Sequence, residues 1–351
     1  MYAKRFARPG LAVIITALPA CDNVSFGGIQ LELRPPEVTE EAAVPGSPSP
    51  DASGEEEPTL EPVDIGDLIY IVERGEGSSA TILPIARVTP DGYEPVPDPE
   101  EIPDLVERFA LGRWEAGVEF PLVAHGRRVG TFVSDGTTVE DDSTCRIRPR
   151  GTGHVELAPE AAVLDRLLAT EPSSAPVREP WTPLARFAAD EDLRAGSLNI
   201  AQRLIPTLGV LWPPSIPEAR RDLQPFASTP GDASGFAASY IYGDRLAVGP
   251  TNPRAYSLFV LATAGESRYE PLMTWVQLAP DGKAYPRFVG SHALRDSIAS
   301  DVVLEVFGET ERWFTVLGVE DEEWSALYLD ECGQAPARSG IRTFDPPGSN
   351  N

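Results

Sequence analysis

Alternating apolar and polar positions mark the first third of the chain as β-rich. A turn signal at Thr89–Gly92 separates two such runs, which is typical of an antiparallel hairpin. The spacing of the runs predicts a small antiparallel β domain of five to seven strands over residues 66–158. The expected strands include Leu68–Glu73, Ala80–Val88, Glu119–Ala124, Arg128–Ser134, Cys145–Arg148 and His154–Leu157.

A helical period replaces this alternation in two places. Inside the first domain, Pro103 precedes Leu105, Val106 and Phe109, which share one helix face, so a short helix is expected there. Residues 159–235 then predict a helical connector that ends in a proline-rich loop. Its expected helices are Glu160–Ala169, Thr182–Leu193 and Leu198–Ile205.

Strand patterns return over residues 236–335, and they repeat. Ala238–Gly243, Tyr256–Val260 and Tyr269–Trp275 resemble, in the same order, Leu304–Gly308, Trp313–Leu317 and Trp324–Tyr328. Units of three short strands that end in an aromatic strand stack into propeller blades or continue an antiparallel sheet. The expected fold class is therefore mainly β with a helical connector (α+β). It combines a small N-terminal antiparallel β domain with a C-terminal antiparallel, partial-propeller-like domain of two related units, and residues 336–351 form a disordered tail.

The segment Leu294–Leu304 (LRDSIASDVVL) resembles a degenerate FG-GAP/VCBS repeat, in which an aspartate-rich calcium loop precedes a buried strand. Asp296 and Asp301 occupy positions where that repeat has acidic residues, and they are the weak candidates for metal ligands. Calcium takes six to eight oxygen ligands, so two carboxylates make a poor site and no bound metal is expected. The resemblance implies a role in adhesion or protein contact.

The N-terminus predicts export. Lys4, Arg5 and Arg8 precede the apolar run Leu11–Ala20, which is too short to span a bilayer, so residues 1–20 are expected to be a signal peptide. Leu18-Pro19-Ala20-Cys21 resembles the lipobox of bacterial lipoproteins, which implies lipidation of Cys21. An ordinary secretory signal followed by a chance cysteine is the alternative.

Composition predicts a flexible spacer near the N-terminus and excludes nucleic acid as a partner. Residues 21–65, with the lipidated cysteine at their start, are expected to be a disordered acidic spacer, because proline, glutamate and serine dominate from about residue 35 onward. The whole chain has a net charge of −25, so it lacks the basic surface that nucleic acid requires. Anionic headgroups would repel it as well, so membrane contact is assigned to the lipid anchor.

The two remaining cysteines are Cys145 and Cys332, which lie 187 residues apart. An even number of cysteines in an oxidising compartment favours a disulfide, and two free thiols are the alternative.

The sequence contains no nucleophile elbow, zinc-protease, P-loop or dinucleotide-binding motif. Lys283 follows a Pro-Asp-Gly turn and is expected to be exposed. Trp275, Trp313 and Trp324 fall in expected strands, where core packing is commoner than stacking on a sugar. Catalysis is therefore not expected, and neither catalytic residues, ligand-binding residues nor a cofactor can be assigned.

These observations predict a lipid-anchored protein on the extracytoplasmic side of a bacterial cell envelope, with the inner or the outer membrane left open. We expect a non-catalytic binding or scaffolding role, with an envelope protein or a glycan as partner. A carbohydrate or cell-wall hydrolase and an accessory subunit of a membrane complex are the alternatives.

Overall fold

The structure is a computed structural model that describes residues 60–172, 189–227, 235–293, 300–333 and 341–344. The signal peptide, Cys21, nearly all of the spacer, Asp296 and most of the expected helix Thr182–Leu193 lie outside these ranges. All described residues belong to one compact unit, which spans residues 58–351.

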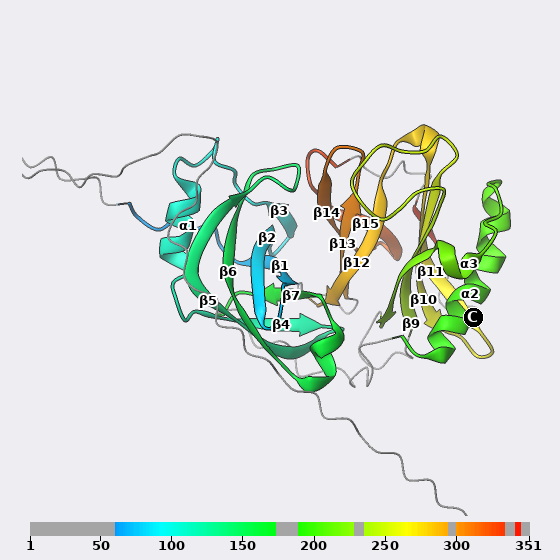
Figure 1. Ribbon diagram of the computed structural model, residues 1–351, viewed down its shortest axis with the longest axis horizontal. Helices are drawn as coiled ribbons and strands as arrows, with labels where there is room; N and C mark the ends of the chain where they lie inside the picture. The colour runs from blue at the N-terminus through cyan, green and yellow to red at the C-terminus, as the bar shows by residue number, and fades with distance from the viewer. Residues whose placement is uncertain (1–59, 173–188, 228–234, 294–299, 334–340, 345–351) are drawn as a thin grey trace, which may run out of the picture. The chain divides into compact units, whose positions relative to one another are not determined.

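The first part of this unit is a closed antiparallel barrel (Figure 1). The strand order is β1-β7-β4-β5-β6-β2, and β2 pairs with β1 to complete the ring, while β3 extends β2 as a short hairpin. The barrel elements are β1 (Leu68–Arg74), β2 (Ser79–Thr89), β3 (Gly92–Pro95), α1 (Leu105–Arg113), β4 (Glu119–Ala124), β5 (Arg127–Asp141), β6 (Arg148–Leu157), η1 (Pro159–Val163) and β7 (Arg166–Thr170).

Period-2 alternation gives β1 two buried faces. Tyr70 and Val72 point into the barrel core, whereas Ile69 and Ile71 belong to a second core outside the barrel. The barrel core extends to Ile65, which is 3% exposed, so the folded part begins inside the segment expected to be spacer. α1 begins after Asp104 and buries Leu105, Val106 and Phe109, the three side chains that its sequence pattern had placed on one face.

The strand that closes the barrel is where the sequence-based expectation is wrong. Residues 160–169 were expected to form a helix, but they form η1 and then β7, which pairs with β1 and β4. Leu167 and Ala169 face the barrel core and Leu168 faces the opposite side, as in a strand. A short apolar run fits either period, and the free edges of β1 and β4 select the extended form.

Two antiparallel sheets form the second part, and they pack face to face. The four-stranded sheet has the order β12-β13-β14-β15, and the five-stranded sheet has the order β16-β11-β10-β9-β8. Their shared core contains Trp275, Trp313 and Trp324, as the strand patterns predicted. The strands are β8 (Arg220–Phe226), β9 (Gly235–Tyr242), β10 (Tyr256–Ala264), β11 (Tyr269–Leu278), β12 (Tyr285–His292), β13 (Asp301–Phe307), β14 (Arg312–Glu320), β15 (Glu323–Leu329) and β16 (Ile341–Thr343), and the 3-10 turn η3 (Ala279–Asp281) follows β11.

The repeated sequence segments fall on corresponding strands of the two sheets. The first copy supplies β9, β10 and β11, and the second supplies β13, β14 and β15. With β8 and β12 in front, each copy is a four-stranded antiparallel meander. The mainly antiparallel β class is thus confirmed. Among the described residues, however, the two units form a sandwich and not successive propeller blades.

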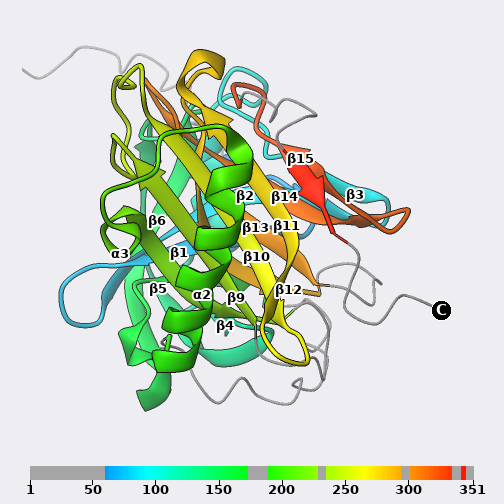
Figure 2. The ribbon, with the colours of Figure 1, turned by 90° about the vertical axis from the view of Figure 1, so that its right-hand side faces the viewer.

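The connector covers the outer face of the five-stranded sheet (Figure 2). It comprises α2 (Glu191–Leu204), η2 (Ile205–Leu208) and α3 (Ile216–Ala219), and Asp190 caps α2 by accepting a hydrogen bond from the Leu193 amide at 2.9 Å. Within the expected disordered tail, Ile341–Thr343 instead form β16, because they pair with β11.

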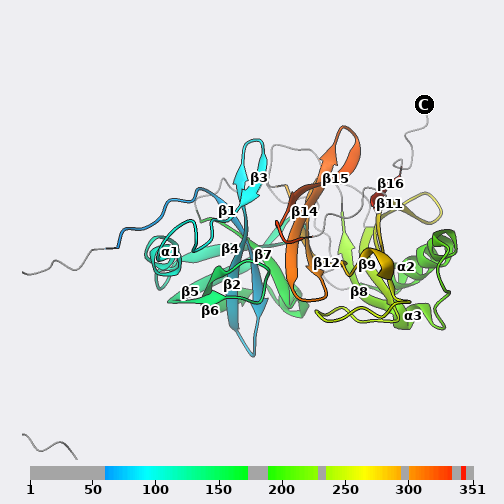
Figure 3. The ribbon, with the colours of Figure 1, turned by 90° about the horizontal axis from the view of Figure 1, so that it is seen from above.

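The outer face of the four-stranded sheet packs on the barrel. Val303, Phe314 and Val316 meet Ile71 and Leu83 in one buried cluster. Barrel, four-stranded sheet, five-stranded sheet and connector therefore follow one another as layers (Figure 3).

Candidate functional site

The two cysteines meet at the junction of barrel and sandwich. Cys145, in the loop between β5 and β6, and Cys332, just after β15, are joined as a disulfide with Cα atoms 6.0 Å apart. The Cys145 amide also donates to the Arg312 carbonyl at 3.1 Å. The loop between β5 and β6 is thus fastened to the second part by a covalent bond and a backbone hydrogen bond.

A buried ion pair lies beside this disulfide. Arg148 and Asp330 are each 1% exposed, and the Arg148 guanidinium donates to Asp330 Oδ1 at 2.5 Å. Arg148 also donates to the Pro84 carbonyl at 2.9 Å, and Asp330 Oδ2 accepts from the Phe314 amide at 2.9 Å. The pair ties β6 to the end of β15, and both of its side chains are buried.

A second charge network crosses the same junction. Arg312 donates to Glu73 at 2.9 Å and to the fully buried Glu305 at 2.6 Å, and Arg166 reaches Glu305 at 3.2 Å. Burial raises the pKa of Glu73, but Arg312, with help from Arg166 and Arg150, outweighs it and holds that pKa below its usual value. Because the carboxylates are committed to arginines, the network serves cohesion and not acid–base chemistry.

His125 is the buried histidine of the junction. It occupies the β4–β5 turn with φ at +51°, is 3% exposed and stacks on Phe288 with ring centroids 6.4 Å apart. Burial lowers the pKa of His125 to about 4, although a hydrogen bond with the Pro225 backbone opposes the shift. The imidazole is therefore neutral at pH 7.

Lys283 is not exposed, contrary to the expectation from its turn sequence. Its side chain is 1% exposed, and its ammonium group lies 3.2 Å from Asp244 Oδ2 and donates to the Gly249 carbonyl at 3.2 Å. It also lies 4.9 Å from the centre of the Tyr285 ring. Tertiary packing of the β9–β10 loop over the residue produces this burial, which turn chemistry alone does not show.

The weak metal candidates do not form a site in the described part of the chain. Asp301 is 1% exposed and accepts a hydrogen bond from the Tyr93 hydroxyl at 2.5 Å, while Asp296 lies outside the described residues. Within the described ranges, no group of three or more His, Cys, Asp or Glu side chains is placed to hold a metal ion.

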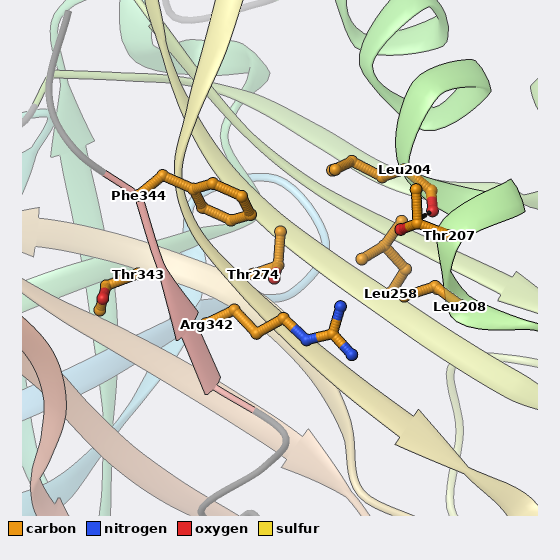
Figure 4. A pocket seen from close by; sticks show the side chains of 8 residues that line it. All are labelled: Leu204, Thr207, Leu208, Leu258, Thr274, Arg342, Thr343 and Phe344. Atoms are coloured by element: carbon orange, nitrogen blue, oxygen red, sulfur yellow. Dashed lines mark hydrogen bonds between the residues drawn. The ribbon is translucent and has the colours of Figure 1, made fainter.

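Two hollows that are lined by connector residues are the remaining candidates for a binding site. A hollow of about 280 Å³ separates α2 and η2 from β10, β11 and the chain end of β16 (Figure 4). Its apolar walls are Leu204, Leu208, Leu258 and Phe344, and the Arg342 guanidinium points into it. We call this space the arginine hollow.

A second hollow, of about 230 Å³, lies where α3 meets β9. Pro213, Pro214 and Tyr242 supply ring surfaces, and Glu218 and Arg221 supply opposite charges. We call it the proline hollow.

The chain between the two hollows exposes apolar side chains. Leu211 is 55% exposed and Trp212 is 50% exposed, whereas Trp114, Trp275, Trp313 and Trp324 are at most 9% exposed. We call residues 204–219 the connector face. Sequence reasoning missed it; the signal was Leu-Trp-Pro-Pro, an aromatic residue in a segment with no strand or helix period to bury it.

No helix in the described ranges is long and apolar enough to cross a membrane. Comparisons with protein-family models, with curated proteins and with solved structures found no match.

Proposed function

We propose that the protein is a lipoprotein, anchored through Cys21 on the extracytoplasmic side of a bacterial membrane, that binds an envelope component without catalysing a reaction. Two observations support the compartment. The N-terminal segment resembles a signal followed by a lipobox, and Cys145 and Cys332 lie within bonding distance, as is typical of proteins in oxidising compartments.

The connector face carries the binding proposal. Isolated exposed apolar residues are ordinary, but here Leu211 and Trp212 are adjacent and stand in the chain between residues that line two hollows. Tryptophan is also among the residues that contribute most to binding energy at interfaces. At the junction of barrel and sandwich, by contrast, the charged side chains form ion pairs with one another.

The geometry favours binding over the hydrolase alternative. Glycoside hydrolysis generally uses two carboxyl groups that flank the scissile bond. Glu218 is the single carboxylate among the described residues that line either hollow.

We also propose that the two meanders are related to FG-GAP/VCBS repeats. Each sequence copy forms a four-stranded antiparallel unit, which is the size of a propeller blade, and this supports a duplicated ancestral unit.

The anchor is tested by the intact mass of the protein extracted from membranes, with and without reduction. We expect residues 21–351 plus a diacylglycerol and an acyl group, and a gain of two hydrogens on reduction. Cys21→Ala is the control and should abolish the lipid adduct. An unprocessed chain with free thiols would remove the compartment assignment.

The binding surface is tested by labelling a cysteine placed at Trp212→Cys. We expect a maleimide to react with it in the purified protein and to react less in intact envelopes. Val163→Cys is the matched control, because Val163 is 65% exposed on the barrel, away from the connector. Equal reactivity of the two sites in envelopes would contradict a binding role for the connector face.

A further inference from the structure

We propose that the arginine hollow binds one acyl chain that carries an anionic headgroup, with the chain against the leucines and the headgroup on Arg342. This inference deepens the proposed binding function by naming a ligand class for one of its hollows.

The strand register places Arg342 on the correct face. Arg342 is the cross-strand partner of Thr274, whereas Ile341 is the partner of Trp275. Ile341 and Trp275 both belong to the sandwich core, so the alternation of side chains directs Arg342 and Thr274 to the opposite face, beneath the connector. Figure 4 shows the guanidinium extending toward Leu258 and Leu208, while Thr343 points away.

The walls of the hollow suit an alkyl chain. Leu258 is fully buried in β10 and forms part of the floor, and Leu204 and Leu208 contribute half-buried side chains from the connector. The Thr207 hydroxyl is already used, because it donates to the Leu204 carbonyl at 2.8 Å. The cavity volume of about 280 Å³ lies at the small end of ligand sites, so it holds a short chain or one end of a longer one.

The positive charge of Arg342 favours an anionic headgroup. Arg342 is exposed and has no carboxylate partner among the described residues, whereas Arg203 at the end of α2 is paired with Glu270 at 3.4 Å. A guanidinium matches the geometry of carboxylate and phosphate oxygens, and both hydrogen bonds to it can form in one plane. A ligand with an anionic headgroup would pair with the Arg342 guanidinium, and its hydrocarbon chain would pack against the apolar walls of the hollow.

The test uses the full chain with Cys21→Ser, which removes the proposed lipid attachment point. Octanoate and octyl phosphate are titrated by calorimetry beside octanamide, acetate and inorganic phosphate. We expect both octyl anions to bind, and octanamide and the bare anions to bind more weakly by roughly 10-fold or more, since charge-assisted hydrogen bonds and apolar burial each contribute at that level. If only one octyl anion binds, it identifies the headgroup.

Arg342→Gln should weaken binding of the octyl anions by about 10- to 100-fold and leave octanamide unchanged. Arg254→Gln removes the same charge from an exposed position outside the hollow and should leave every affinity unchanged. Leu208→Asn should weaken all three octyl probes, with circular dichroism to verify folding.

Equal affinity for octanoate and octanamide, or no binding of any octyl probe, would overturn the proposal. These results are independent of the lipid adduct on Cys21 and of cysteine protection at position 212, so the proposed function can stand or fall separately.

Discussion

The guanidinium of Arg148 and the carboxylate of Asp330 meet at 2.5 Å in the interior of the protein, although 182 residues separate them. Arg148 belongs to barrel strand β6, and Asp330 directly follows β15, the last strand of the four-stranded sheet. Both carboxylate oxygens of Asp330 are used, because Asp330 also accepts from the Tyr328 hydroxyl and the Phe314 amide. The pair therefore fixes one part against the other, in company with the disulfide.

Breaking this pair should destabilise the protein strongly. Arg148→Met leaves the Asp330 carboxylate buried without its counter-charge, so we expect the free energy of unfolding to fall by about 3–5 kcal/mol in a urea titration. Arg148→Met combined with Asp330→Asn should lose clearly less than the sum of the single changes. Arg87→Met breaks an exposed pair with Glu94 and should cost less than about 1 kcal/mol. Similar losses at the two sites would refute a special role for the buried pair.

Reduction should lower stability by a comparable amount. The disulfide closes a loop across 187 residues, and the chain-entropy model gives an upper value of about 5 kcal/mol for such a loop. Denaturant titrations with and without reductant measure the difference. Cys145→Ser with Cys332→Ser should resemble the reduced protein and should not respond to reductant. An unchanged titration of the native chain under reduction would show that the bridge contributes nothing.

His125 should make the protein less stable in acid. Its pKa is about 4 in the folded protein and 6.5 in the unfolded chain, so the unfolded state binds the proton first as pH falls. His125 therefore contributes no pH dependence above about pH 7.5, and by pH 4 it has lowered the free energy of unfolding by about 3 kcal/mol.

Buried carboxylates add their own pH dependence, so the comparison is with His125→Asn, which tolerates the left-handed backbone at this turn. Unfolding free energies at pH 7.5, 6 and 4.5 should converge between the two proteins as pH falls. Parallel profiles would show that His125 is protonated equally in both states.

Lys283 should resist amine reagents while the protein is folded. Its side chain is 1% exposed and its ammonium group is held by Asp244 and the Gly249 carbonyl. Lysines occur only at positions 4 and 283, so peptide masses after acetylation report on Lys283 directly. We expect no label on it in the native protein and full labelling in urea. Rapid native labelling would place the side chain in solvent.

Several elements followed from local sequence. The strand pattern predicted β1, β2 and β4 nearly at their bounds and the first half of β5, and the apolar face after Pro103 predicted α1. The even number of cysteines after Cys21 favoured a bridge between Cys145 and Cys332, which the structure contains. Local pattern suffices here because each element buries the face that its own period defines, whatever its neighbours are.

The arrangement of these elements needed the tertiary structure. Residues 166–170 become β7 because β1 and β4 offer free edges, and residues 341–343 become β16 because β11 does. The same distant packing buries Lys283, leaves Trp212 exposed and turns Arg342 toward the connector. The sequence by itself determined the mainly β class, most of the strands and the apolar face of α1. The tertiary structure decided which edges pair and which side chains remain open to a ligand, because both depend on residues far apart in the chain.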